Sequence, residues 1–426
     1  MLQQAQPDRV VTLSLLKSIR DLVILASLSL FPQVAYSKTF TTSGFVNFSA
    51  ASRNQDSALE QQTLPDGLTK NHLHNPQSIG NDSQIFWKLV KESKDGVKYG
   101  VTAKTEFNFN SDGRNENPNL DQIFTFAESD FGKFELGNNQ AVNQKMKSGP
   151  TRFARGAGGI NGKYLEQVNL PMLGGSGSAS HFILLAQSPI GHGGYAKSFY
   201  RPDSSQYSGA NRSQFRALKD DSFDGVEDAT KLNYYSPRIS GIQLGASYAP
   251  NTANIGATKQ VAKDVNTTSI KDIFSLGANY SEDFDNLGVE ISATAEKGKV
   301  KNSRADLFAY DLGTSLSYFG FTLGASYGSW GSSMQPTDGT YAKQGDTNYR
   351  TLGIAYQFGP ISTSITSLNS RFQKNNYSAI SFGVDYKLTR SLMPYFELTK
   401  FSFNPSSQGS LGNQGYVFLV GALYSF

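Results

Sequence analysis

The sequence predicts an all-β chain folded as a transmembrane antiparallel β-barrel, and three observations support this class. Apolar and polar residues alternate along many segments, no stretch beyond residue 37 resembles a transmembrane helix, and the chain ends on an apolar strand pattern. Because only every second residue of such a strand faces lipid, a hydrophobic content of 38% is compatible with a membrane wall. The 12% of aromatic residues fits two interfacial girdles.

The C-terminal segment 416–426 shows the alternation most clearly. Counting back from Phe426, every second residue is apolar, namely Tyr424, Ala422, Val420, Phe418 and Tyr416. This ending resembles the last strand of bacterial outer-membrane β-barrels, in which such a pattern is a signal for the assembly machinery. We therefore expect Phe426, Tyr424, Val420 and Phe418 to form that signal. The alternative is an edge strand of a soluble sandwich, although so apolar an edge would invite aggregation.

Residues 1–37 have the organisation of a secretory signal peptide. Arg9, Lys17 and Arg20 precede an apolar run over 22–31, which is too short to span a bilayer but fits an h-region. The small residues Ala35 and Ser37 then occupy the positions that a signal peptidase reads. We expect cleavage after residue 37 and a barrel domain over 38–426; a start codon further downstream and a buried N-terminal helix are alternatives.

Charge, cysteine and histidine content narrow the function. Segment 1–37 holds three of the 39 Lys+Arg and two of the 35 Asp+Glu, so the mature chain carries 36 basic and 33 acidic residues, which does not indicate nucleic-acid binding. The absence of cysteine excludes a disulfide framework and thiol chemistry. A hydrolase would need an imidazole base beside a nucleophile on adjoining strands, whereas the four histidines fall in expected loops. We therefore expect no enzyme; the histidines are His72, His74, His181 and His192.

Alternation predicts sixteen strands. In the clearest, 96–110, Lys98, Lys104 and Glu106 share the face opposite the apolar one and are expected to point into the lumen. The sixteen predicted strands are 40–52, 82–93, 96–110, 119–129, 131–140, 229–237, 240–250, 271–282, 287–299, 305–318, 320–331, 347–358, 360–373, 376–388, 392–404 and 413–426.

The connections alternate between short turns and longer loops, and an even strand count places both termini on the periplasmic side. The longest connection is 141–228. Within it, 181–188 has strand character, and together with 195–201 it would give an eighteen-stranded barrel. A strand or helix packed inside the lumen is equally compatible with 181–188.

Two segments, 130–138 and 235–250, resemble the general diffusion porins of Gram-negative outer membranes. The first, DFGKFELGN, is similar to the turn and strand that lead into the third loop of that family, and the second, YSPRISGIQLGASYAP, to the hairpin after it. The resemblance implies a sixteen-stranded, trimeric, water-filled channel whose third loop folds inward as a constriction. Segment 141–228 is longer than the family usually has.

The first part of that loop is basic. Over 141–170, Glu166 is the single acidic residue and the net charge is +4, because the basic residues are Lys145, Lys147, Arg152, Arg155 and Lys163. Inside a pore these cations would favour anions. The alternative places several of them on the outer surface, against lipopolysaccharide phosphates. The family usually opposes loop carboxylates to wall arginines, so we carry over no individual residue.

A weak calcium-loop pattern lies further along the chain. Asp220, Ser222, Asp224 and Gly225 match the first half of such a loop, but its twelfth position is Lys231, where calcium loops need a bidentate Glu. A solvated acidic loop is the simpler interpretation. His72 and His74 lack a third metal ligand nearby, so no cofactor is expected.

The sequence thus favours an outer-membrane porin for passive diffusion of small hydrophilic solutes and ions, with a mild preference for anions. As partners we expect outer-membrane lipid, lipopolysaccharide, the assembly machinery and two further copies of the chain. A substrate-selective channel for a sugar or an anion, blocked by micromolar substrate, is the alternative. A surface adhesin would show no conductance.

Overall fold

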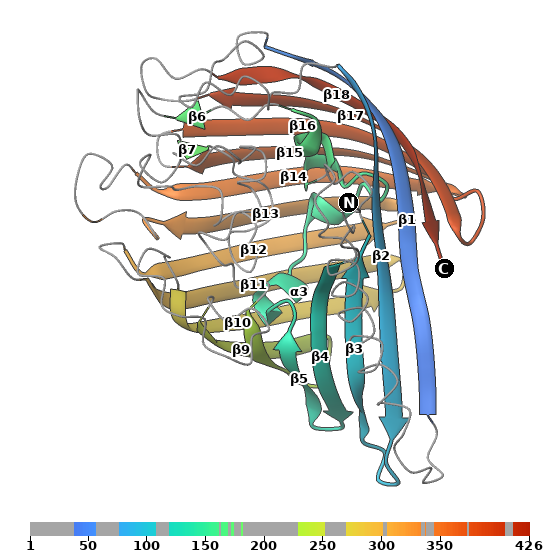
Figure 1. Cartoon of the computed structure of the whole chain (residues 1–426), viewed down its shortest axis with the longest axis vertical. Coiled ribbons are helices and arrows are strands. Elements are labelled where there is room, and N and C mark those ends of the chain that lie inside the picture. Colours follow the sequence, from blue (N-terminus) through green and yellow to red (C-terminus); the bar gives the residue numbers. More distant parts are fainter. Residues whose placement is uncertain are drawn as a thin grey trace, which may run out of the picture.

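The chain closes into an antiparallel barrel of sixteen strands (Figure 1). The computed structural model describes residues 38–56, 76–107, 119–161, 163–168, 172–173, 180–181, 229–251, 270–300, 305–333, 337, 345–372, 375–404 and 412–426. Strands that follow one another in the sequence are neighbours in the barrel, which the pairing of the first strand with the last completes. The predicted strand number is therefore confirmed.

The strands agree closely with the predicted ranges. They are β1 (Lys38–Gln55), β2 (Gln77–Glu92), β3 (Lys98–Glu106), β4 (Asn119–Ser129), β5 (Gly132–Asn138), β8 (Thr230–Tyr235), β9 (Ile242–Asn251), β10 (Ile270–Phe284), β11 (Leu287–Val300), β12 (Leu307–Tyr318), β13 (Phe321–Gly331), β14 (Thr347–Phe358), β15 (Ile361–Phe372), β16 (Asn375–Tyr386), β17 (Leu392–Asn404) and β18 (Asn413–Ser425).

The eighteen-stranded alternative is wrong, because the described part of 141–228 adds no strand to the barrel. β6 (Met172–Leu173) and β7 (Ser180–His181) pair with each other as a separate two-stranded sheet. His181 is the one described residue of the candidate strand 181–188, and the second candidate, 195–201, lies outside the described residues.

The last strand closes the barrel at the apolar C-terminal segment. β18 pairs with β1 in antiparallel register, and two backbone hydrogen bonds join Phe426 to Gly44, at 3.0 Å and 3.1 Å. The predicted signal residues Phe418, Val420, Tyr424 and Phe426 are all exposed on the outer face. Closure removes both unpaired edges, which a barrel surrounded by lipid requires. Recognition of this strand by the assembly machinery stays a prediction.

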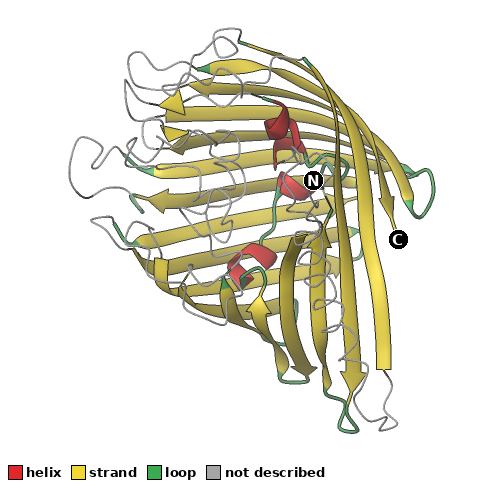
Figure 2. Ribbon diagram, in the orientation of Figure 1, coloured by secondary structure: helices red, strands yellow, loops and turns green. Residues whose placement is uncertain are grey.

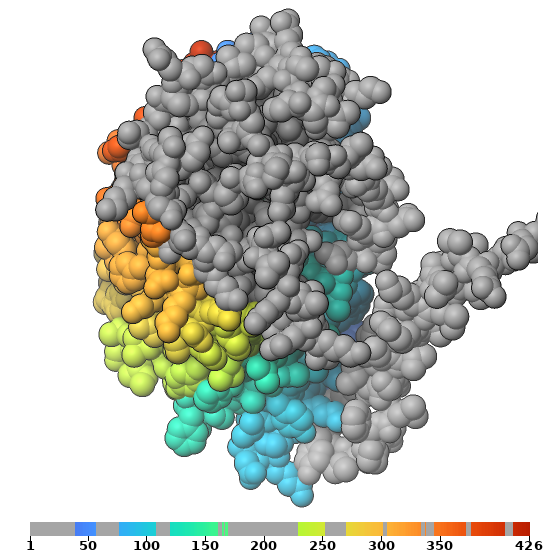
Figure 3. Space-filling model, turned by 60° about the vertical axis from the view of Figure 1, so that its left-hand side comes forward, coloured from blue at the N-terminus to red at the C-terminus, as the bar shows by residue number. Residues whose placement is uncertain are grey.

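The wall exposes apolar side chains on its outer face and buries polar ones on its inner face, which is the opposite of a soluble protein. In β10, Phe274 and Leu276 are 56% and 61% exposed, whereas Ser275 between them is 1% exposed. Aromatic pairs lie near both ends of the strands. One of them, beside the short turns, is Phe321 with Tyr356, whose ring centroids are 4.3 Å apart. Figure 3 shows one flank of the wall, coloured from yellow-green to orange over β8 to β14. Lipid on this outer face accounts for the exposed apolar side chains.

The connections at one end of the barrel are tight turns. Between β12 and β13, Phe319 and Gly320 both have positive φ, 45° and 83°, as a two-residue hairpin turn of the I′ type requires. Glycine adopts this conformation freely, whereas Phe319 is strained in it. These turns match the short periplasmic connections that the sequence predicts.

Residues 141–161 and 163–168, here called the inward segment, lie inside the barrel (Figure 2). The segment contains α3 (Val142–Lys145), η2 (Pro150–Arg152), η3 (Gly159–Asn161) and η4 (Lys163–Gln167). In the described part of the chain no helix is long and apolar enough to cross a membrane. The inward path predicted for the start of segment 141–228 is thus the observed one.

Candidate functional site

The inward segment follows the inner wall from β9 to β17, and wall side chains bind its backbone. The Val142 N–H donates to Ser247 Oγ on β9 at 2.9 Å, and the Ser148 N–H donates to Ser292 Oγ on β11 at 2.8 Å. Further along, the Gly159 N–H donates to the Glu397 carboxylate on β17 at 2.8 Å. Hydroxyl and carboxylate groups of the wall therefore replace the hydrogen-bond partners that a strand would supply.

Asp385 on β16 provides the strongest of these attachments. Its two carboxylate oxygens accept the backbone N–H groups of Arg155 and Gly156, at 3.0 Å and 3.1 Å. The Gly156 carbonyl in turn accepts a hydrogen bond from the Asn47 side chain on β1, at 2.9 Å. Charge-assisted hydrogen bonds of this kind are roughly twice as strong as neutral ones. They fix the middle of the inward segment on the far side of the lumen from its starting point.

Inward-facing glycines on the wall leave room for the segment. A Cβ atom at Gly313 on β12 would lie 2.1 Å from the Ser148 carbonyl oxygen, and one at Gly245 on β9 would lie 2.5 Å from Met146 Sδ. The same close approach occurs at Gly277 on β10, Gly324 on β13 and Gly353 on β14. Sequence reasoning missed these positions, although glycines at corresponding places in several strands were a visible signal.

The second part of the segment packs against an apolar patch inside the lumen. Ile160, Tyr164 and Val168 are fully buried against wall residues of β14 to β18. Tyr164 stacks with Phe401 at 6.5 Å between ring centroids; the other wall residues are Tyr349, Leu368, Tyr377, Phe403, Val417 and Leu419. The inner face of the wall is therefore not polar throughout, because the inward segment shields this part of it from water.

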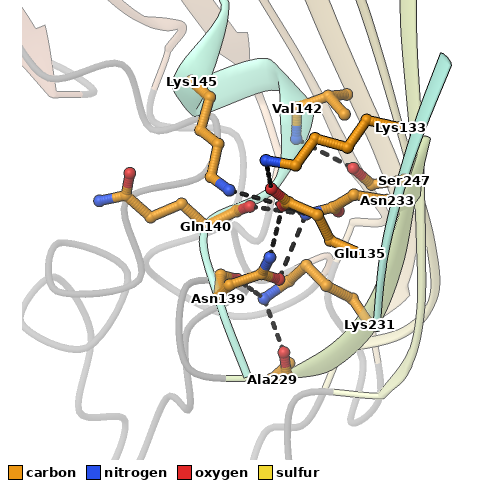
Figure 4. A network of polar contacts seen from close by, with 10 residues as sticks. All are labelled: Lys133, Glu135, Asn139, Gln140, Val142, Lys145, Ala229, Lys231, Asn233 and Ser247. Carbon is orange, nitrogen blue, oxygen red and sulfur yellow. Dashed lines mark hydrogen bonds and ion pairs between the residues drawn. The ribbon is translucent and has the colours of Figure 1, made fainter. Parts of the chain in front are cut away.

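A buried carboxylate on β5 holds the beginning of the segment (Figure 4). Glu135, 2% exposed, binds Lys133 Nζ at 2.7 Å and Lys145 Nζ at 2.6 Å, and Figure 4 shows both ammonium groups directed at it. The side-chain amide of Asn139 also donates to it, at 2.7 Å. Buried Lys231 on β8 donates to the Ala229 and Asn139 carbonyls. Lys145, which sequence analysis assigned to the pore, thus shares one carboxylate with Lys133, and the three groups together keep one net positive charge.

Lys147, two residues further on, keeps a different environment. It is half-buried, and burial lowers its pKa to about 8, while the Asp311 and Glu296 carboxylates act in the opposite direction. Burial also lowers the pKa of Lys145, and the Glu135 carboxylate opposes that shift. Lys147 is therefore still mostly protonated at pH 7, but its charge is lost within the range of ordinary buffers.

The remaining predicted loop residues divide into two groups. Arg152 and Arg155 are exposed inside the barrel, and no ion pair among the described residues involves either of them. Lys163 and Glu166 lie in η4, but their side chains fall outside the description. The calcium-loop candidates Asp220, Ser222 and Asp224 lie outside the described residues, and so do His72 and His74.

The predicted wall residues lie on β3. Lys104 forms ion pairs with Asp121 on β4 and with Glu106, the latter at 3.6 Å, and Glu106 also accepts a hydrogen bond from Gln84 on β2. The charge of Lys104 is thereby balanced. Lys98 begins the strand, at the end of the barrel that carries the tight turns, and is exposed.

Lysines on β2, β5 and α3 lie over two phenylalanine rings of β4. Lys88 and Lys133 lie 5.1 Å and 5.6 Å from the Phe126 ring centroid, and Lys145 lies 5.1 Å from that of Phe124. Such contacts are attractive because a ring face carries negative charge. Sequence analysis did not single out Lys88 or Lys133, and only the register of β2 to β5 brings them together.

A cavity of about 810 Å³ lies between the first part of the inward segment and the wall formed by β4, β5 and β8 to β11. Its charged lining consists of five basic residues, Lys133, Lys145, Lys147, Arg152 and Arg238, and four acidic ones, Glu128, Asp130, Glu135 and Glu290. Three of the five predicted loop cations therefore meet in one space. A polar cavity bordered by both signs of charge suits hydrated solutes rather than apolar ligands.

Two Rickettsia proteins are similar to this chain in sequence. An uncharacterised protein of Rickettsia conorii is 29% identical over 327 residues, covering 65% of this chain and 68% of the relative. A Rickettsia bellii protein is 26% identical over 409 residues, covering 84% and 85%. Both are known only as uncharacterised proteins.

Solved structures show the same fold at low sequence identity. A triple mutant of the Rhodopseudomonas blastica porin matches with a TM-score of 0.50 and 15% identity, over 91% of this chain and all of that one. A porin refined at 1.8 Å matches with a TM-score of 0.51 and 13% identity over the same shares. The family model for Gram-negative porins matches residues 25–406, and the chain therefore belongs to the Gram-negative porin family, whose barrels lie in the outer membrane.

Proposed function

We propose that this outer-membrane porin is a permanently open channel for small hydrophilic solutes and ions, with a mild preference for anions. The observation that supports the proposal most directly is the position of the inward segment. It is fastened along β9 to β17, so it narrows the lumen without leaving the wall, and it carries exposed Arg152 and Arg155 into the remaining space. A sixteen-stranded barrel is too wide for wall side chains to fill.

Charge balance supports the expected direction of selectivity. Lys104 is paired with two carboxylates, so it adds little to the field in the pore, whereas Lys133 and Lys145 share one carboxylate and contribute one net positive charge. Arg152 and Arg155 form no ion pair among the described residues, and Lys147 is mostly protonated at neutral pH. Because the Debye length is about 10 Å at 0.1 M salt, these charges act only on ions that pass close to them. A mild preference for chloride over potassium follows.

Reversal potentials across a planar bilayer in a KCl gradient test this proposal. Replacing both arginines (Arg152→Gln with Arg155→Gln) is expected to move the permeability ratio toward potassium. The control Lys104→Gln with Asp121→Asn removes an ion pair without changing the net charge, so it should move the ratio less. A cation-selective wild type would contradict the proposed preference. Purified protein without conductance at any voltage would contradict a channel of any selectivity.

We also propose that three copies assemble, as the resemblance to general diffusion porins implies. Trimers should give conductance that appears in steps of three equal levels, and cross-linking of the folded protein in detergent should yield a trimer. A single level per insertion, together with a monomer after cross-linking, would contradict this assembly.

A further inference from the structure

Four inward-facing residues form two neighbouring cross-strand pairs beneath α3. Ser275 on β10 pairs with Glu296 on β11, and Thr294 on β11 pairs with Asp311 on β12. All four are almost completely buried, with exposures between 1% and 4%. Residues directly opposite on one face have Cβ atoms about 5 Å apart, and residues two apart on a strand share that face. The register therefore groups two carboxylates and two hydroxyls on one small area of the inner wall.

The inward segment adds a fifth oxygen to this group. Asn143 on α3 is fully buried, and its amide nitrogen donates to Glu296 Oε2 at 3.2 Å. Its amide oxygen belongs to the same head group and consequently lies near Glu296. The five residues come from three strands and one helix, so the group exists only when the inward segment is seated on the wall.

Within the described ranges of the chain, four oxygens in this group have no hydrogen-bond partner. They are Ser275 Oγ, Thr294 Oγ1, Asn143 Oδ1 and Asp311 Oδ1, and each is shielded from solvent. The other carboxylate oxygen of Asp311 accepts a hydrogen bond from the Tyr349 hydroxyl on β14. Buried polar atoms in proteins almost always have a partner, so a cluster of four without one indicates a bound species.

The charges in the group identify the sign of that species. Lys147 acts electrostatically on both Asp311 and Glu296, but one ammonium group balances only one carboxylate. An ionised Asp311 carboxylate with one unpartnered oxygen would be stabilised by a further positive charge, because an isolated buried carboxylate is strongly unfavourable and otherwise takes up a proton. The remaining donors are neutral oxygens of hydroxyl and amide groups. Oxygen-only donor sets with two carboxylates suit hard cations, above all calcium, which takes six to eight such ligands.

We propose that Asp311, Glu296, Thr294, Ser275 and Asn143 bind a calcium ion between the inward segment and the wall. The ion joins three strands to α3 and so fixes the beginning of the segment in place. This site is distinct from the acidic stretch 220–228 that the sequence pattern suggested. It also does not depend on the ion preference of the pore, since it lies on the covered part of the wall.

Calcium binding to the purified, folded protein in detergent tests the site directly. After treatment with a chelator, equilibrium dialysis against radioactive calcium should show saturable binding at or below about 1 mM. Bound calcium should also raise the temperature at which the folded form is lost on a denaturing gel, because a ligand of the folded state stabilises it. Asp311→Asn and Thr294→Val should each weaken binding by about tenfold or more and remove that stabilisation.

The matched control is Ser364→Ala, which removes a buried inward hydroxyl on β15, away from the group. This variant should bind calcium as the wild type does. A wild type that binds no calcium at about 1 mM would overturn the proposal and leave ordered water as the partner of the four oxygens. Equal binding by wild type, Asp311→Asn and Thr294→Val would also overturn it, since calcium would then lie elsewhere. If one of the two variants does not fold, the other decides.

Discussion

Strands β9 to β17 and strands β2 to β5 line the same lumen, but their inward side chains differ in size and charge. On β9 to β17, glycines and short hydroxyl side chains let the inward segment approach the backbone, as at Gly313 and Ser292. On β2 to β5, long side chains line the lumen: Lys88 is exposed and lies over the buried Phe126 ring, and Lys104 forms an ion pair with Asp121. Small residues thus mark the covered part of a pore wall, and long charged ones mark the part that meets the solute.

The two parts also differ in what holds them together. The covered wall is stabilised by apolar burial and by hydrogen bonds to the backbone of the inward segment, as in a soluble core. The open wall is stabilised by ion pairs that water can screen, such as Lys104 with Asp121. Substitutions on the covered wall should therefore change folding, whereas substitutions on the open wall should change ion flow.

The largest effect is expected on the covered wall at Phe401. Its ring is fully buried against Tyr164, so Phe401→Ala should leave a cavity and lower the free energy of unfolding by about 3–5 kcal/mol. The control Phe418→Ala removes the same ring from the lipid-facing side of β18, where it is exposed. Urea unfolding in detergent measures both, and equal losses would contradict the distinction between a covered and an open wall.

A smaller loss is expected when a methyl group is added beneath the segment. Gly313→Ala would place Cβ 2.1 Å from the Ser148 carbonyl, so the backbone must shift at a cost of about 1–3 kcal/mol. In the control Gly288→Ala on β11, the nearest atom is the end of the Asp283 side chain, which can move away. The single-channel conductance should change in Gly313→Ala and stay unchanged in the control. Unaltered conductance and stability in both would mean that the segment does not need the glycine.

Alternation predicted the strands well because lipid on one side and water or protein on the other impose it on every strand. The clearest difference is β2, which begins at Gln77 rather than at residue 82. Its first residues pair with the end of β1, as Gln77 does with Ser52, although their side chains show no alternation. Backbone hydrogen bonds to β1 are enough to extend β2 to Gln77. The alternation of apolar and polar residues, on which the prediction relied, does not continue into that extension.

The site was harder to predict than the fold. The sequence indicated a basic inward segment, but it gave no sign that Lys145 pairs with Glu135 from another element, or that Lys104 pairs with Asp121 across a register shift. Such pairings depend on how strands and segment meet in space, so the number of basic residues overestimates the charge that an ion encounters. The interior glycines were the one available signal for the path of the segment.

On the boundary between the two walls, Glu135→Gln should sharpen the comparison by releasing charge into the pore. Lys133 and Lys145 would lose their shared carboxylate, so the chloride-to-potassium permeability ratio should rise by about twofold, limited by screening. The control Asp285→Asn makes the same change of charge in the exposed turn between β10 and β11, away from the cavity, and should have less effect. An unchanged ratio in Glu135→Gln would mean that these lysines do not act on passing ions.

The smallest effect is expected from the titration of Lys147, which lies where the covered wall meets the cavity. Its pKa is lowered to about 8, so its ammonium group is mostly charged at pH 7 and mostly neutral at pH 9. The anion preference should therefore fall as the pH rises through 8, by less than the effect of Glu135→Gln. In Lys147→Arg the guanidinium stays charged, so the chloride-to-potassium permeability ratio should be the same at pH 7 and at pH 9. Reversal potentials at the two pH values, in buffer with a calcium chelator so that Asp311 and Glu296 stay free, measure this. The same change between the two pH values in both proteins would show that another group titrates.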